Sequence, residues 1–214
     1  MAAVLDLTHA ITPAIPAYPG TDPPVIRQAS TVERDGFAET LLEMYSHTGT
    51  HVDAPAHMLP GAPTLDQLTV DRFIGPACVI DVSGATNGTL RLAALEPHAG
   101  LVAGCDFVLL HTGWSRNWGD DRYLEGFPVL SGEAAEWLAS RSLKGVGLDA
   151  MSADPVGSVE FPNHLTFFRA GMILIENLNG LDRLIGQRFL FSCLPLAFER
   201  ADGSPVRAVA VVTA

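Results

Sequence analysis

Short apolar runs, six to ten residues long and separated by glycines and prolines, dominate the hydrophobic pattern of this chain. Runs of this length between turn residues are typical of buried strands, whereas helices need longer amphipathic stretches. We therefore expect strands over residues 3–9, 40–46, 77–83, 106–112, 145–150, 171–177, 189–198 and 206–213.

Two helices are expected between these strands. Ser131 is a suitable N-cap for a helix over 132–142, with Glu133 in its first turn, and Thr89 is a suitable N-cap for one over 90–99. A short turn is expected over 178–187. Because strands outnumber helices, the pattern predicts an α/β fold with a mixed or partly closed, barrel-like sheet.

Composition narrows the class of protein. The chain has 214 residues, 48% hydrophobic and 17% charged, which indicates one domain spanning 1–214 with a substantial core. Its net charge of -11 disfavours nucleic-acid binding, and no apolar run is long enough to span a membrane. The N-terminus lacks the basic segment of a signal peptide, and the three cysteines are widely spaced. We expect buried thiols and a cytoplasmic protein.

The stretch HTGTHVDAPAH gathers His47, His51, Asp53 and His57 within eleven residues. Gly49 and Pro55 oppose a helix here. All four polar residues occupy odd positions, so an extended chain would place them on one face. Since a proline limits strand pairing, the segment is expected to be an edge strand or a strand leading into a loop.

Imidazole and carboxylate groups that converge in this way suit a borderline divalent cation such as Zn²⁺ or Mn²⁺. The alternative is a solvated, histidine-rich loop without a ligand. A second group of candidates lies further along the chain, with His164 in an expected loop and Glu176 at the end of an apolar strand. A buried carboxylate needs a partner, which could be a metal or an arginine such as Arg169 or Arg183.

The HTGTHVDAPAH motif resembles the HxGTHxDxPxH pattern of the cyclase family of metal-dependent hydrolases, which includes bacterial kynurenine formamidases. The segments DLTHAITPAIPAYPG, LLHTGW and LPLAFERADGSPVRAVAVV resemble other parts of that family, so the resemblance covers nearly the whole chain. It implies a swivelling β/β/α-type domain that forms at least a homodimer.

The resemblance also implies roles for individual residues. His47, His51 and Asp53 would bind a first metal, His164 would bind a second, and Asp53 and Glu176 would bridge the two, which would be Zn²⁺ or Mn²⁺. His57 would act as the general acid and base. The implied activity is hydrolysis of an amide such as N-formylkynurenine.

One departure concerns the substrate pocket. Formamidases of this kind carry a tryptophan where this chain has Tyr18, in the segment PAYPGT. A tyrosine can still stack on an aromatic substrate, but it changes the pocket. Two alternatives therefore stay open: a one-metal hydrolase of a cyclic amide such as isatin, and a non-catalytic metal-binding protein on the same scaffold.

The remaining polar and aromatic candidates carry less information. His9 and His111 end expected strands, where lone histidines are usually structural. Trp114 and Trp118 could line an aromatic pocket or pack a loop, and Asp149 and Asp154 follow a strand, where carboxylates often cap turns.

Overall fold

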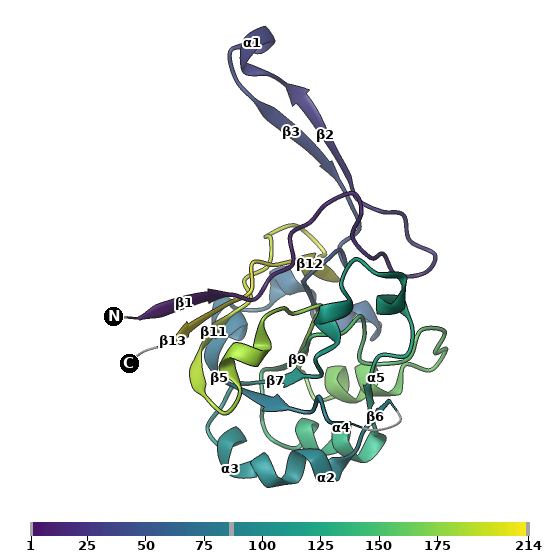
Figure 1. Ribbon diagram of the computed structural model, residues 1–214, viewed down its shortest axis with the longest axis vertical. Coiled ribbons are helices and arrows are strands. Elements are labelled where there is room, and N and C mark those ends of the chain that lie inside the picture. Colours follow the sequence, from purple (N-terminus) through teal and green to yellow (C-terminus); the bar gives the residue numbers. More distant parts are fainter. Residues whose placement is uncertain (1, 86–87, 213–214) are drawn as a thin grey trace.

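A nine-stranded mixed sheet forms the centre of the protein in the computed structural model, which describes residues 2–85 and 88–212 (Figure 1). From edge to edge its strands are β1 (Ala3–Asp6), β13 (Val209–Val212), β11 (Arg188–Ser192), β5 (Ile74–Asp81), β7 (Phe107–His111), β9 (Gly145–Leu148), β10 (Ile173–Glu176), β4 (His51–Asp53) and β12 (Gly203–Pro205). The four strands from β5 to β10 run parallel to one another, and the flanking strands pair antiparallel. The expected α/β fold with a mixed, partly barrel-like sheet is confirmed.

Each of the eight expected strands is present, although most are shorter than the apolar run that predicted them. The run over 189–198 shows why. The regular ladder of β11 ends at Ser192, and beyond it Pro195 has no amide hydrogen to donate and forms only an isolated bridge to Val206.

Both faces of the central strands are buried, because consecutive side chains of a strand point to opposite faces of a sheet. Cys78, Val108 and Val146 face one hydrophobic core, which the helices cover, while their neighbours Val79 and Leu109 face a second core. The helices that pack on the sheet are α2 (Leu92–Leu95), α3 (Ala99–Val102), α4 (Gly132–Ala139) and α5 (Pro162–Arg169), with α2, α3 and α4 below the sheet in Figure 1. All three cysteines are buried and free.

The two helix predictions had different outcomes. Ser131 is the N-cap of α4, where its side chain accepts a hydrogen bond from the Ala134 amide at 3.3 Å, as expected. The prediction that Thr89 caps a helix over 90–99 is wrong, because Thr89 lies in the short strand β6 (Thr89–Leu90), which pairs with β8 (Val129–Leu130). The helical stretch starts after Arg91 and breaks into short pieces, since Pro97 cannot supply a helical amide hydrogen.

Short 3₁₀ helices connect several strands. They are η1 (Pro55–His57), η2 (Leu65–Gln67), η3 (Val70–Phe73), η4 (Glu96–His98), η5 (Trp114–Asn117), η6 (Asp121–Leu124) and η7 (Leu181–Leu184). The last of these confirms the turn expected over 178–187.

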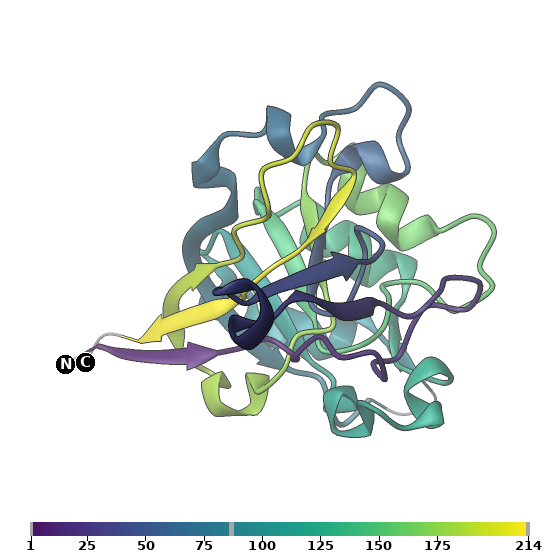
Figure 2. The same cartoon turned by 90° about the horizontal axis from the view of Figure 1, so that it is seen from above.

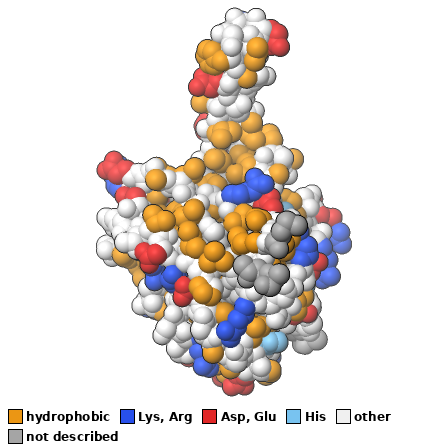
Figure 3. All heavy atoms as spheres, turned by 90° about the vertical axis from the view of Figure 1, so that its left-hand side faces the viewer, with side chains coloured by type: hydrophobic (Ala, Val, Ile, Leu, Met, Phe, Trp, Pro, Cys, Tyr) orange, Lys and Arg blue, Asp and Glu red, His pale blue; other side chains and the backbone are white. Residues whose placement is uncertain are grey.

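A two-stranded arm projects from the body of the protein (Figures 1 and 2). It consists of β2 (Val25–Ser30) and β3 (Glu39–Glu43), which pair antiparallel and are joined by the one-turn helix α1 (Val32–Asp35). The sequence predicted only the second strand. Large apolar side chains of the arm are exposed, among them Leu42 and Phe37, and Figure 3 shows further apolar side chains on the face below it. Within the described residues, no helix is long and apolar enough to cross a membrane.

Candidate metal centre

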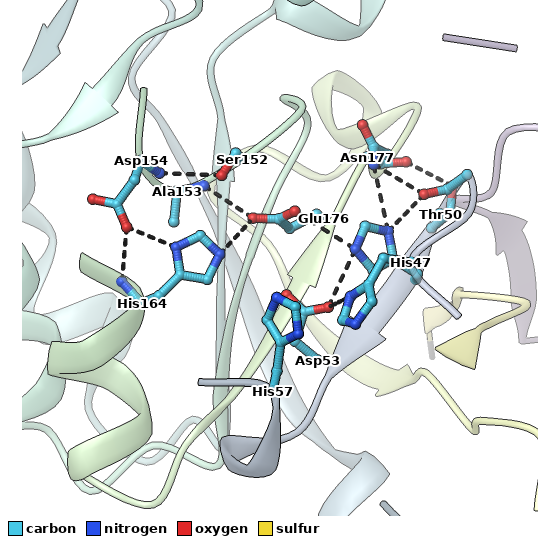
Figure 4. A network of polar contacts seen from close by, with 12 residues as sticks. His47, Thr50, Asp53, His57, Ser152, Ala153, Asp154, His164, Glu176 and Asn177 are labelled. Atoms are coloured by element: carbon cyan, nitrogen blue, oxygen red, sulfur yellow. Dashed lines mark hydrogen bonds and ion pairs between the residues drawn. The ribbon is translucent and has the colours of Figure 1, made fainter. Parts of the chain in front are cut away.

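Segments that lie far apart in the sequence meet beside β4 (Figure 4). Of the two alternatives expected for this segment, the edge strand is wrong, because β4 lies between β10 and β12, and the strand that leads out of the sheet is confirmed, because β4 ends at Asp53. Its antiparallel register with β10 places Glu176 opposite His51, and its register with β12 places Gly203 opposite Asp53. The ladder therefore brings the end of β10 to the histidine motif.

The extended segment expected over 47–57 is also only partly correct, since the strand covers His51 to Asp53 alone. His47 lies in the turn before the strand, and His57 ends the 3₁₀ helix η1, which begins at Pro55. The polar side chains converge even so, because these two bends carry His47 and His57 back toward Asp53.

The first group of ligand atoms belongs to His47, His51 and Asp53, and these atoms lie within 4.8 Å of one another. His47 Nδ1 donates to Asp53 Oδ1 at 2.6 Å, and His51 Nε2 is 3.2 Å from the same oxygen. Both His51 and Asp53 are buried. This arrangement of two imidazoles and one carboxylate matches the donors that Zn²⁺ and Mn²⁺ accept.

A second group, formed by Asp53, His164 and Glu176, shares Asp53 with the first. His164 Nε2 is 3.3 Å from Glu176 Oε1, while Glu176 Oε2 is 3.6 Å from His51 Nε2. Glu176 thus contacts a histidine of each group, and no pairing with Arg169 or Arg183 is present in the described structure. Two adjacent cation positions can be formed, with Asp53 and Glu176 between them.

His164 lies on α5, so the prediction that it lies in a loop is wrong. The helix begins at Pro162, and a proline is tolerated in the first turn, where amide hydrogens have no helical acceptor. The amides of Asn163 and His164 instead donate to the carboxylate of Asp154, each at 3.0 Å.

Neighbouring polar groups fix the orientation of the histidine rings. His164 Nδ1 donates to Asp154 Oδ2 at 2.6 Å, and His51 Nδ1 donates to the Gly49 carbonyl at 2.8 Å. In both rings Nε2 is therefore left facing the carboxylates. Partners of this kind set the tautomer of a metal-binding histidine.

The Gly49 carbonyl is itself held in place. Asn177 Nδ2 donates to it at 2.9 Å, and Asn177 Oδ1 accepts a hydrogen bond from the buried Tyr123 hydroxyl at 2.7 Å. Asn177 has a left-handed backbone with φ of 58°, which asparagine adopts more readily than most residues. The network links the histidine motif to the main hydrophobic core.

The electrostatics of the site favour positive charge. Burial acts to lower the pKa of His47, but the carboxylates of Asp53 and Asp202 outweigh it and raise that pKa to about 10. Burial acts in the same way on His164, and Asp154 and Glu176 raise its pKa to about 10. Near pH 7 and without a metal ion, these rings therefore hold protons between the surrounding carboxylates. The donor set therefore fits one or two divalent cations, which would replace those protons.

His57 differs from these rings. It lies 4.0 Å from His47 and 6.5 Å from His164 between ring centroids. Burial lowers its pKa, and the positive charges of His47 and His164 lower it further, while Asp53 and Asp202 act in the opposite direction. An imidazole that exchanges its proton at lower pH than its neighbours suits proton transfer.

A cavity of about 510 Å³ opens onto these groups. Apolar and aromatic side chains form much of its wall, including Tyr18, Tyr45, Met58, Met151 and Phe161. Tyr18, which the sequence singled out for substrate contact, lies on this wall. The cavity is large enough for a bicyclic or aryl amide.

Other candidates have structural positions. Trp118 stacks on His9 with ring centroids 4.0 Å apart, and Trp114 Nε1 donates to the Tyr123 carbonyl at 3.0 Å, so both tryptophans pack a loop. His111 pairs with Asp81 at 3.1 Å. Three polar residues at the site lay outside the predicted set: Asp154, Asn177 and Asp202. For Asp154 the position after a strand was the available signal; nothing in the local pattern marks Asp202.

Comparison with known proteins gives consistent matches. Residues 5–155 match the family model described as "Putative cyclase". The kynurenine formamidase of Bacillus cereus is 31% identical over 207 residues, which are 96% of this chain and 95% of that protein. An isatin hydrolase bound to the product analogue thioisatinate has a TM-score of 0.89 and 27% identity, covering 100% of this chain and 93% of that one. A predicted metal-dependent hydrolase from Bacillus stearothermophilus has a TM-score of 0.82 and 29% identity, covering 99% and 98%.

Proposed function

Since this chain belongs to the Cyclase family, we propose that it is a metal-dependent amidohydrolase that converts N-formylkynurenine to kynurenine and formate. The family membership confirms the resemblance drawn from the HTGTHVDAPAH motif. The observation that carries the proposal is the pair of ligand groups that share Asp53, with His57 beside them and a cavity in front.

We assign the metal-binding roles by geometry. His47, His51 and Asp53 would hold one divalent cation, and Asp53, His164 and Glu176 a second; the donors fit two Zn²⁺ ions, with Mn²⁺ also suitable. Cations bound there would lower the pKa of water and polarise the carbonyl of the amide.

His57 supplies the proton transfers in this proposal. With a lowered pKa, His57 is largely neutral near pH 7, so it can accept a proton from the attacking water and then deliver it to the amide nitrogen, which leaves once protonated. His57 belongs to neither of the two groups that share Asp53, so its side chain stays available to the substrate. Tyr18, on the cavity wall, would stack on the aromatic ring of the substrate.

The test is hydrolysis of N-formylkynurenine by protein that has been treated with a chelator and then supplied with Zn²⁺ or Mn²⁺. We expect metal-restored turnover, nearly complete loss of turnover in His57→Ala, and unchanged metal content in that variant. His98→Ala, at a histidine in η4, is the matched control. A metal-loaded protein without turnover would refute the formamidase assignment, and parallel loss of metal and activity in His57→Ala would make His57 a ligand.

Glu176 is tested separately. Because it contacts a histidine of each ligand group, Glu176→Ala should lower the metal content of the purified protein. Unchanged metal content would contradict its bridging role.

A second candidate is hydrolysis of a cyclic amide such as isatin. The similarity to the solved isatin hydrolase over the full chain favours it. A protein that binds a single metal, with His164 uncoordinated, and opens isatin faster than it deformylates N-formylkynurenine would support this candidate instead.

We also propose that the protein is a homodimer. The arm exposes apolar side chains such as Val25, Phe37 and Leu42 to solvent, which is costly for a chain that stays single. Pro24 and Tyr45, at the base of the arm, line the cavity, so a second copy packed on the arm would lie near its mouth.

A further inference from the structure

Asp202 is a carboxylate of the cavity wall to which neither shared ligand group assigns a role. It lies directly before β12, and its side chain is 46% exposed. Asp202 Oδ2 accepts a hydrogen bond from His47 Nε2 at 3.1 Å and lies 3.7 Å from His57 Nδ1. One carboxylate oxygen therefore faces both a proposed metal ligand and the proposed proton donor.

The backbone holds Asp202 in this place. Its carbonyl accepts a hydrogen bond from the Ala54 amide at 2.8 Å, and Ala54 is the residue that precedes the 3₁₀ helix carrying His57. On the other side, the Ala201 amide donates to Asp66 Oδ1 at 3.2 Å. Asp202 is thus fixed relative to His57 by hydrogen bonds that do not involve its own side chain.

The next residue, Gly203, leaves room for the His47 ring. A Cβ atom at this position would lie 2.7 Å from His47 Nε2 and 2.8 Å from His47 Nδ1, closer than real side chains approach. The backbone at Gly203 therefore forms a flat surface against which the imidazole packs. Two consecutive residues therefore contact the His47 ring: Asp202 accepts its hydrogen bond, and Gly203 packs against it.

We propose that Asp202 is a positioning residue for amide hydrolysis, which aims His47 Nδ1 at the first cation site and His57 Nε2 at the leaving nitrogen. By accepting from His47 Nε2, Asp202 leaves Nδ1, which faces Asp53, as the coordinating atom. By lying on the Nδ1 side of His57, it leaves the opposite nitrogen to deliver the proton. This inference rests on the proposed amidohydrolase function.

The same three residues could instead form a cation site of their own, because ligand atoms of His47, His57 and Asp202 lie within 4.8 Å of one another. His47 Nδ1 already faces Asp53. A cation bound to His47 Nε2 would therefore compete for this ring with the cation held by His47, His51 and Asp53. The geometry favours Asp202 as a positioning residue over Asp202 as a metal ligand. The number of metal ions that the protein binds distinguishes these two roles.

The test compares the wild type with Asp202→Asn, which keeps the shape of the side chain and removes its charge. Metal affinity is measured by titrating Zn²⁺ into chelator-treated protein, and kcat is measured at saturating metal with two substrates. N-formylkynurenine needs a proton on its leaving nitrogen, whereas 4-nitrophenyl formate releases a stable phenolate without one. Glu199→Gln is the matched control, because it removes a carboxylate charge three residues before Asp202 from a side chain that is 85% exposed.

We expect Asp202→Asn to weaken Zn²⁺ binding about 10- to 100-fold, the usual range when a partner of a metal-binding histidine is lost. At saturating metal it should slow N-formylkynurenine hydrolysis by about 10-fold or more, a part of what general acid catalysis supplies, and leave the ester within about two-fold. Glu199→Gln should change neither the Zn²⁺ affinity nor the rate on either substrate.

Three results would overturn the proposal. These are unchanged metal affinity with equal losses on both substrates, the same selective loss in Glu199→Gln, and a third bound Zn²⁺ that disappears in Asp202→Asn. If the wild type hydrolyses neither substrate, the proposed function fails, but the metal titration still decides whether Asp202 positions His47.

Discussion

Binding of the metal should release protons, and the number released is set by the histidines of the site. In the metal-free protein the pKa values of His47 and His164 are raised to about 10, against burial, by the carboxylates around them. Near pH 7 each ring is then protonated by roughly a thousand to one. A protonated imidazole cannot coordinate a metal, so each ring must lose one proton when its cation binds.

The number of protons released follows from how the histidines are divided between the two ligand groups. His47 belongs to the first group and His164 to the second, so filling both groups releases about two protons, one for each cation. The direction in which metal affinity changes with pH also follows. Since protons and metal compete, the apparent affinity of each site rises as pH increases, by about 10-fold per pH unit, until the pH approaches 10.

Calorimetry measures this directly. Chelator-treated protein is titrated with Zn²⁺ at pH 7 in buffers of different ionisation enthalpy, and the slope of observed heat against ionisation enthalpy gives the proton count. His164→Ala should reduce the count by one and remove the second binding event. A count near zero in the wild type would refute the reasoning, because it would mean that His47 and His164 are neutral before the metal arrives.

Three further predictions concern groups that support the site. Tyr123→Phe removes only the hydroxyl that donates to Asn177, so metal affinity should fall about 10-fold while the fold is kept; unchanged affinity would show that the network serves stability alone. Asp154→Asn should weaken binding of the second cation about 10- to 100-fold in the same titration and spare the first, since His164 is the proposed ligand that Asp154 contacts. Replacing the arm residues 26–42 with a short glycine-serine loop should convert a dimer to a monomer in analytical ultracentrifugation; a protein that stays dimeric would place the interface elsewhere.

Much of the sheet could be predicted because its central strands are buried on both faces. Runs such as 106–112 and 171–177 are apolar without alternation, as expected for strands whose side chains are buried on both faces of the sheet. The pattern missed β2 because Arg27, Gln28 and Ser30 interrupt its apolar run, whereas β3, which is equally exposed, was predicted from the apolar run over 40–46. It also could not predict that β4 is interior, since its neighbours β10 and β12 lie more than a hundred residues away.

The metal centre was also predictable only in part. His47, His51 and Asp53 lie within seven residues, so their spacing carried the information. Asp202 comes from a distant turn and is polar and partly exposed, like most aspartates, so no local pattern separates it from the others. Only the register that places β12 beside β4 brings it to His47.

Secondary structure at the site also explains why spacing alone misled. The odd-numbered positions suggested one strand face, yet only His51 and Asp53 share one. His47 reaches Asp53 through the turn at Gly49, where φ is 66°, and His57 returns through the 3₁₀ helix that Pro55 begins. These two bends bring His47 and His57 together. A regular strand would hold them about 30 Å apart, at roughly 3.3 Å per residue. With its ends folded back, the motif places the ring of a proposed proton donor 4.0 Å from the ring of a proposed metal ligand, so that both can face one substrate.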